Sequence, residues 1–148
     1  MRIASQIIAV GLLTLGAGNS YVATVAETCT QSAADSVEAG IFTVPLYAVS
    51  FWLLLRRPLP PIMVLLMIPA FFGICYDVWW TARFAYEYLV HSIPVCDLVT
   101  GEGGFEFDGR EPFYLALWAV LSLLGTAGMC VVLIGAVRDI RRRHLGAA

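Results

Sequence analysis

Residues 61–90 constrain the fold of this chain more than any other part of the sequence. They begin as an uninterrupted apolar run, then carry Asp77 and the tryptophan pair 79–80, and continue through Arg83 and Glu87. A helix needs about 20 mostly apolar residues to cross the ~30 Å hydrocarbon layer of a membrane. Indole rings are favoured where lipid meets water. The order of apolar, aromatic and charged residues therefore predicts a helix that crosses a bilayer and rises out of it.

Three further apolar runs make a membrane bundle the expected fold class. In the whole chain 59% of the residues are apolar and only 14% are charged, whereas soluble domains average about 25% charged residues. We therefore predict an all-α integral membrane protein, a four-transmembrane-helix bundle that forms a single domain over residues 1–148. The expected helices cover about 3–26, 39–55, 61–90 and 112–137, the outer loops 27–38 and 91–111, the cytoplasmic turn 56–60 and the cytoplasmic tail 138–148.

Two of these runs have special features. The run 3–26 has the basic start and small residues of a cleaved signal peptide. A retained helix is favoured because the apolar character continues through residues 21–26. The run 39–55 is near the lower length limit for a span, and its Pro45 removes a backbone donor, which predicts a kink.

The arginines predict the orientation of the bundle. Seven of the nine basic residues lie at the N-terminus, in the turn 56–60 or in the tail, and most acidic residues lie in or beside the two outer loops. Basic segments stay in the cytoplasm by the positive-inside rule, so both termini are expected there. The cluster 141–144 anchors this topology and also has the charge to attract anionic lipid. A basic set without lysine and short loops favour a multi-pass protein of the bacterial inner (plasma) membrane.

The four cysteines fall into two groups in this topology. Cys29 and Cys96 each lie in an outer loop, on the side of the membrane where disulfides persist. A Cys29–Cys96 disulfide would join the two loops; two unpaired thiols, or a bond to a partner chain, are the alternatives. Cys75 and Cys130 lie inside predicted helices at different depths, so we expect them to be packing residues.

Asp77 is the candidate for an intramembrane polar site. Acidic residues within the hydrocarbon are functional candidates by default, and a proton or ion relay would use Asp77. Rise per residue places Asp77 ~24 Å above residue 61, near the far edge of the hydrocarbon, and Arg83 and Glu87 in or above the headgroups. Alternatively, Asp77 forms only local hydrogen bonds to Tyr, Trp or Thr groups or to water.

The loop 91–111 predicts a structured outer surface. The alternation Phe105-Glu106-Phe107 between glycine-containing turns predicts a short strand, and residues 95–99 are its expected partner in a β-hairpin. Phe105 and Phe107, together with Arg83 and Glu87, are candidates for contact with another protein. The acidic residues of the loop 91–111 could supply oxygen ligands to calcium, but their spacing matches no known calcium-binding loop. We therefore expect them to form an acidic surface.

Known catalytic patterns are missing from the sequence. It has no lysine, no HExxH, no phosphate-binding glycine loop and no haem motif, so we expect no catalytic residue, metal, cofactor or nucleic-acid partner. The expected partners are the lipid bilayer and another membrane, periplasmic or extracellular protein. We therefore predict a non-enzymatic accessory or assembly subunit that acts through its outer loops. The alternatives are a small transporter or ion- or proton-conducting protein that uses Asp77, and a membrane thiol oxidoreductase that uses Cys29 and Cys96.

Overall fold

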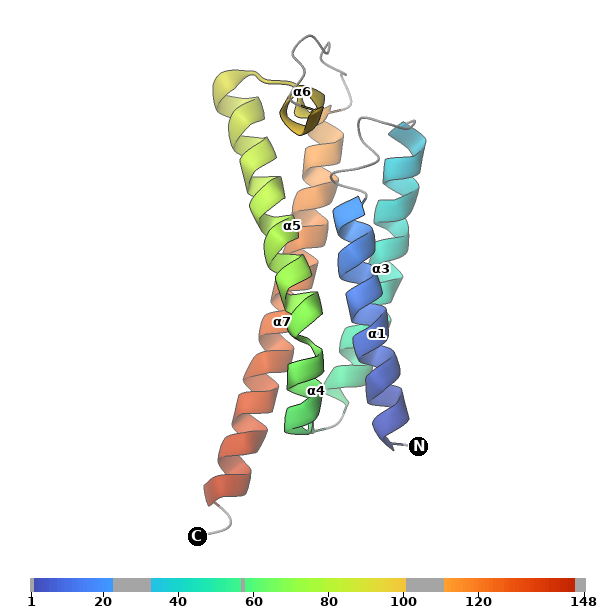
Figure 1. Cartoon of the computed structure of the whole chain (residues 1–148), viewed down its shortest axis with the longest axis vertical. Helices are drawn as coiled ribbons and strands as arrows, with labels where there is room; N and C mark the ends of the chain where they lie inside the picture. The colour runs from blue at the N-terminus through green and yellow to red at the C-terminus, as the bar shows by residue number, and fades with distance from the viewer. Residues whose placement is uncertain (1, 23–32, 57, 101–110, 146–148) are drawn as a thin grey trace.

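The described part of the chain is helical apart from short connections, and contains no strand. A computed structural model describes residues 2–22, 33–56, 58–100 and 111–145. Long columns made by α1, α3, α4 with α5, and α7 run side by side in Figure 1. The elements are, in chain order, α1 (Arg2–Tyr21), α3 (Ala33–Leu55), α4 (Pro61–Leu66), α5 (Ile68–Tyr86), the π-helical turn η2 (Glu87–His91), α6 (Val95–Thr100) and α7 (Glu111–Leu145).

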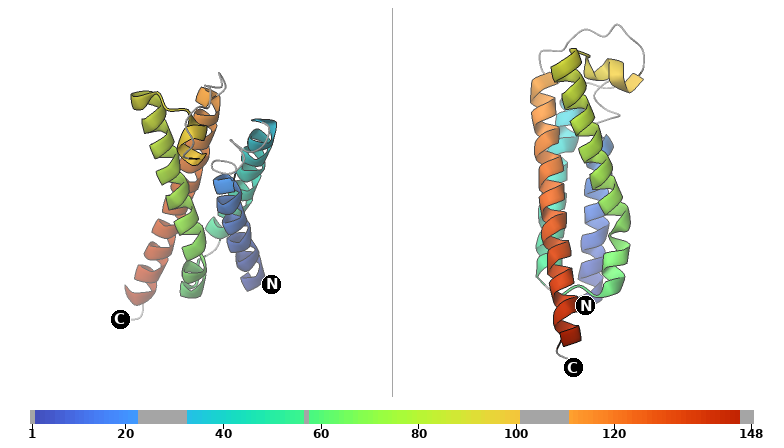
Figure 2. Two further views of the ribbon diagram at one scale, coloured as in Figure 1. Left: turned by 45° about the horizontal axis from the view of Figure 1, so that its top comes forward. Right: turned by 90° about the vertical axis from the view of Figure 1, so that its left-hand side faces the viewer.

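Each column packs on two others to form a closed bundle. α1 lies against α3 and α5, and α7 lies against the same two helices from the other side. Figure 2 shows the pair of α1 and α3 beside the pair of α5 and α7. We name the two ends of the bundle by residues: the Arg56 end carries the turn between α3 and α4, and the α6 end carries α6 and the start of α7.

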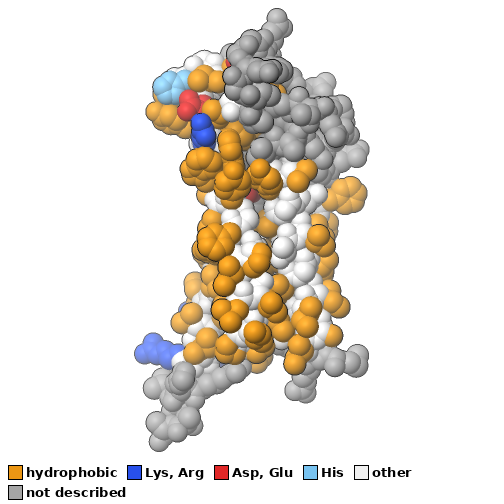
Figure 3. Space-filling model, in the orientation of Figure 1, with side chains coloured by type: hydrophobic (Ala, Val, Ile, Leu, Met, Phe, Trp, Pro, Cys, Tyr) orange, Lys and Arg blue, Asp and Glu red, His pale blue; other side chains and the backbone are white. Residues whose placement is uncertain are grey.

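The helices have the length and composition of membrane spans. Three apolar segments are long enough to cross a membrane, namely Ile3–Tyr21, Pro61–His91 and Pro112–Arg142, and the apolar part of α3, Gly40–Leu55, is shorter. Figure 3 shows mostly hydrophobic side chains between the two ends of the bundle and charged side chains at the ends themselves. An exposed surface of this kind indicates a membrane protein, because large exposed apolar areas are rare on soluble monomers.

The column expected to be one helix from residue 61 to residue 90 is interrupted once, at Met67, and its last turn is π-helical. Pro61 starts α4 at a position that suits proline. α4 then ends before Met67, and α5 begins at Ile68 with Pro69 in its first turn. Pro69 cannot donate a hydrogen bond, and its ring would clash with the carbonyl of Leu65 in a continuous helix, which explains the break. The column ends at η2, where Ser92 adopts a left-handed conformation with φ 54°.

Other predicted boundaries also differ from the structure. Residues 95–99 belong to helix α6, so the strand predicted there is wrong. Val95 and Leu98, three residues apart, both pack against the core at the α6 end, which suits a helix better than a strand. α3 starts at Ala33, within the predicted loop, and α7 continues to Leu145, through most of the predicted tail. α3 also continues through Pro45.

Glycines bring α3 close to its neighbours. A Cβ atom at Gly128 of α7 would collide with the ring of Phe51. At Gly16 of α1 and Gly125 of α7, a Cβ would lie 3.0 Å and 3.2 Å from the ring of Tyr47. Small residues therefore allow close helix contacts at these three positions.

Candidate functional site

The buried face of α5 places Asp77 inside the bundle. Its buried residues recur three or four positions apart, as expected for one face of a helix. Asp77 lies in the middle of this face, and its side chain is only 1% exposed. The buried residues of α5 are Ala70, Ile74, Asp77, Thr81 and Phe84.

Two serines from other helices donate hydrogen bonds to the Asp77 carboxylate. Ser20 Oγ of α1 lies 3.0 Å from Asp77 Oδ2, and Ser122 Oγ of α7 lies 2.8 Å from the same oxygen. All three side chains are buried. One carboxylate oxygen therefore joins α1, α5 and α7. The expected partners of Asp77 were Tyr, Trp or Thr groups or water, whereas two serines donate to Oδ2 in the structure.

Further polar side chains continue this network at the same level. Thr81 Oγ1 lies 3.1 Å from Ser122 Oγ, with either hydroxyl able to donate. On the other side of the bundle, Asn19 Nδ2 of α1 donates to Thr43 Oγ1 of α3 at 3.0 Å. We call the whole set the polar layer: Asn19, Ser20, Thr43, Tyr47, Asp77, Thr81 and Ser122.

Tyr47 of α3 adds a buried hydroxyl to the layer. Its ring fits between Gly16 and Gly125, and its side chain is 2% exposed. Ser20 and Asp77 are polar neighbours of its hydroxyl group. The Tyr47 hydroxyl therefore lies among the polar side chains of the layer.

Apolar clusters enclose the polar layer on both sides. Toward the Arg56 end, the large core cluster includes Leu13, Met67 and Val132. Toward the α6 end, Phe84 and Trp118 form a second cluster with Val95 of α6 and Tyr114 of α7. The Asp77 carboxylate is buried between these clusters, so its electrostatic interactions are stronger than they would be in water.

The layer has the composition of a site for one small positive charge. Its oxygens come from a carboxylate and several hydroxyls, which are the hard ligands that oxygen-preferring cations bind. Among the described residues, no group of three or more His, Cys, Asp or Glu side chains is placed to hold a metal ion. A single carboxylate balances a monovalent cation, whereas a divalent ion would leave uncompensated charge in an apolar interior.

The other charged candidates lie above this layer, toward the α6 end. The Arg83 guanidinium lies over two indole rings, 5.5 Å from the centroid of Trp79 and 5.3 Å from that of Trp80. Glu87 begins η2 and is half-buried, and the imidazole of His91 lies against Tyr86. Arg83 and Glu87 therefore lie toward the α6 end and are separate from Asp77.

The remaining candidates are only partly described. Cys29, Phe105 and Phe107 lie outside the described residues, so the Cys29–Cys96 disulfide and the exposed phenylalanines stay predictions. Cys96 is half-buried in α6. Cys75 and Cys130 are free thiols on the exposed surface, so the prediction that they are packing residues is wrong. Their helix faces point away from the core.

Sequence reasoning missed Ser20 and Tyr47 as parts of the site. Ser20 was only one of several polar interruptions in an apolar run, and Tyr47 is one of six tyrosines in the chain. A usable signal was the spacing of Ala70, Ile74 and Asp77, which already places Asp77 on an inward face. An inward-facing Asp77 requires polar partners at the same depth on other helices, and the hydroxyls of Ser20 and Tyr47 are such partners.

Comparison with protein-family models, curated proteins and solved structures finds no match to this chain.

Proposed function

We propose that the four helical columns all cross the membrane, with both termini in the cytoplasm of a bacterium. Arginines at the Arg56 end support this orientation, since Arg56, Arg138, Arg141 and Arg142 all lie there and are exposed. The Arg56 guanidinium lies 3.5 Å from the centroid of the Trp52 ring. This is an arrangement typical of the interface, where tryptophan and arginine side chains anchor helix ends.

Reporter fusions test this orientation. Green fluorescent protein fused after the full-length chain is expected to fluoresce, because the α7 end lies in the cytoplasm. Alkaline phosphatase at the same place is expected to be inactive, whereas alkaline phosphatase after Thr100 is expected to be active, because it reaches the outer side. Active phosphatase after the full-length chain would contradict the proposal.

We propose that the polar layer binds one monovalent cation, H⁺ or Na⁺, and that the protein is a small ion-coupled transporter or ion-conducting protein. The observation that carries this proposal is the buried Asp77 carboxylate, which accepts hydrogen bonds from Ser20 and Ser122 on two other helices. Intramembrane acids that face a bundle interior are typical of ion and proton sites.

Cation binding at this layer would be coupled to the arrangement of the helices. The ligands come from separate helices, so a cation bound to Asp77 neutralises the negative charge to which both α1 and α7 donate hydrogen bonds. The apolar clusters on both sides would have to separate for the ion to leave toward either end. A site closed on both sides is what alternating access requires of its occluded state.

Thermal unfolding of the purified protein tests cation binding directly. In mild detergent at constant ionic strength, replacing choline by Na⁺ is expected to raise the Tm of the native chain. The stabilisation is about 2.7 kcal/mol when Na⁺ is a hundredfold above its Kd. Acid is expected to weaken the apparent affinity for Na⁺, because a proton competes for the same carboxylate.

The variant Asp77→Asn is expected to remove this response and ion flux in proteoliposomes, because the amide has no charge for a cation to balance. Glu87→Gln is the matched control: it makes the same chemical change outside the layer and is expected to keep the response. A pH response without a Na⁺ response, lost in Asp77→Asn, would identify the proton as the ion. Equal responses of the native chain and Asp77→Asn to both ions would refute the proposal.

An accessory or assembly subunit is the second candidate. It is favoured by the covered α6 end, where Val95 of α6 is buried against Phe84 and Trp118. Such a cap gives the outer side a folded surface that a partner protein could recognise. Purification in mild detergent tests this candidate: a defined companion protein would support it, and a partner-free particle with Asp77-dependent flux would exclude it.

A further inference from the structure

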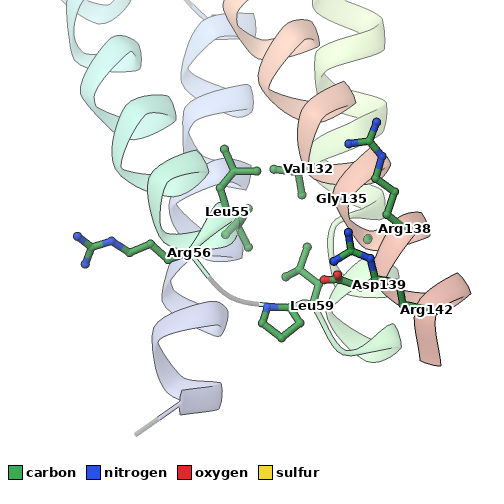
Figure 4. A pocket seen from close by; sticks show the side chains of 11 residues that line it. Leu55, Arg56, Leu59, Val132, Gly135, Arg138, Asp139 and Arg142 are labelled. Atoms are coloured by element: carbon green, nitrogen blue, oxygen red, sulfur yellow. The ribbon is translucent and has the colours of Figure 1, made fainter. Parts of the chain in front are cut away.

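A pocket at the Arg56 end combines apolar walls with arginines. Its volume is about 380 Å³, and it lies between the end of α3, the turn after it and α7. Leu54, Leu59 and Val132 provide apolar walls, and Arg138, Asp139 and Arg142 of α7 lie at its rim (Figure 4). It lies far along the bundle from the polar layer and shares no residue with it.

The rim carries a net positive charge. Arg138 and Arg142 are four residues apart, so they lie on one face of α7. Figure 4 shows Arg142 turned back over the pocket toward Asp139, whereas Arg56 extends away from it. Asp139 offsets one of the two positive charges, and both arginines are exposed and therefore able to reorient toward a ligand.

The position of the pocket in the bundle indicates the kind of ligand. At the pocket, the apolar part of α7 ends and arginines follow. Such a change is typical of the depth at which lipid headgroups begin. Arginine binds phosphate groups with two parallel hydrogen bonds. A ligand that suits both parts of the pocket is therefore amphipathic, with a phosphate at the rim and a hydrocarbon chain along the leucine wall.

We propose that this pocket binds an anionic phospholipid, with its phosphate between Arg138 and Arg142 and one acyl chain against Leu54, Leu59 and Val132. Basic pockets between membrane helices are known sites for anionic headgroups. A bound lipid would join α7 to the turn that connects α3 and α4. The site is independent of the cation proposed at Asp77.

The test measures binding of phosphatidylglycerol to the full-length protein in detergent by native mass spectrometry. Phosphatidylcholine has acyl chains but no net charge, so it tests the contribution of the chains. Glycerol 3-phosphate has the phosphate but no acyl chain, so it tests the contribution of the headgroup. The native chain is expected to prefer phosphatidylglycerol over phosphatidylcholine and to bind glycerol 3-phosphate much more weakly. The double variant Arg138→Ala/Arg142→Ala is expected to weaken binding of phosphatidylglycerol at least about tenfold, because each arginine supplies charge-assisted hydrogen bonds.

One blocking variant, Gly135→Leu, and two matched controls, Arg141→Ala and Gly11→Leu, separate the pocket from general effects of charge and packing. Arg141→Ala removes the same charge from the same helix but outside the pocket, and is expected to bind like the native chain. Gly135→Leu places a side chain into the pocket, where a Cβ meets no atom within 4 Å, and is expected to block the lipid without disturbing the fold. Gly11→Leu makes the same change on an open face of α1 and is expected to leave binding intact.

Four results would overturn the proposal. Equal binding of phosphatidylglycerol and phosphatidylcholine would exclude recognition of the phosphate's charge. Equal losses in Arg141→Ala and in the double variant would show general attraction to a basic tail. Binding of glycerol 3-phosphate as tight as that of phosphatidylglycerol would assign the pocket to a soluble phosphate compound. Unchanged binding in Gly135→Leu would place the lipid elsewhere.

Discussion

The Gly128→Ala variant is expected to lose about 1–3 kcal/mol of its free energy of unfolding, the usual cost of overpacking a core. The ring of Phe51 occupies the space that the new methyl group would need, so α3 and α7 have to move apart or the ring has to leave its position. Tyr47 lies one turn along α3, between Gly16 and Gly125, and limits such movement. Unfolding in mixed micelles, followed by circular dichroism, measures this effect.

Gly135→Ala is the control for this substitution. The same methyl group meets no atom within 4 Å there, and alanine is the better helix former by about 1 kcal/mol in soluble helices. Combining Gly128→Ala with Phe51→Ala is expected to remove most of the added cost, because the small side chain leaves room. Strictly additive effects of the two substitutions would contradict a direct collision between these residues.

Removing the hydroxyls that serve Asp77 is expected to destabilise the bundle strongly. Ser20→Ala and Ser122→Ala each remove one hydrogen bond from Oδ2 and leave the carboxyl group buried. Loss of a partner from a buried polar group costs about 1–3 kcal/mol. This exceeds the average of about 0.6 kcal/mol for hydrogen bonds between membrane helices, because the acceptor here is an acid. Unfolding in mixed micelles measures both variants.

A double-mutant cycle identifies the cause of this loss. In an Asp77→Ala background, Ser122→Ala is expected to cost little, because the acceptor it served is gone. Thr126→Ala is the matched control on α7: its hydroxyl donates at 2.7 Å to the carbonyl of Ser122, within its own helix. An equal loss from Thr126→Ala, or an undiminished loss from Ser122→Ala without Asp77, would show that the polar layer is not responsible.

The lengths of the apolar runs predicted where the helices lie, but did not predict where they are interrupted. The apolar runs predicted the start of α1, the end of α3 and the start of α7 within one residue, whereas α3 begins six residues before its predicted run and α7 ends eight residues after its own. The break at Met67 was missed because it follows from Pro69, whose effect is local and does not lower the apolar content of the run. The expected strand over residues 95–99 failed for a different reason. Val95 is buried by Phe84 and Trp118, and no property of a six-residue segment predicts such distant contacts.

The candidate site could be predicted only in part. Asp77 was identifiable because an acid in an apolar run is rare. Its depth was estimated along one straight helix, which placed it close to lipid headgroups. Its partners depend on which faces of α1 and α7 turn inward, and this is decided by contacts such as Tyr47 against Gly16 and Gly125. Those contacts join residues far apart in the chain, so spacing within one helix does not predict them.

The polar layer also has a consequence for how the protein is made. Ser20 and Asp77 precede α7 in the chain, so Ser122 can donate to Asp77 only after α7 has been made and has packed against α5. Until then the Asp77 carboxylate lacks the hydrogen bond from Ser122, and a polar group without its partner in an apolar environment raises the free energy of the chain. The packing of α7 therefore completes the polar layer as well as the bundle.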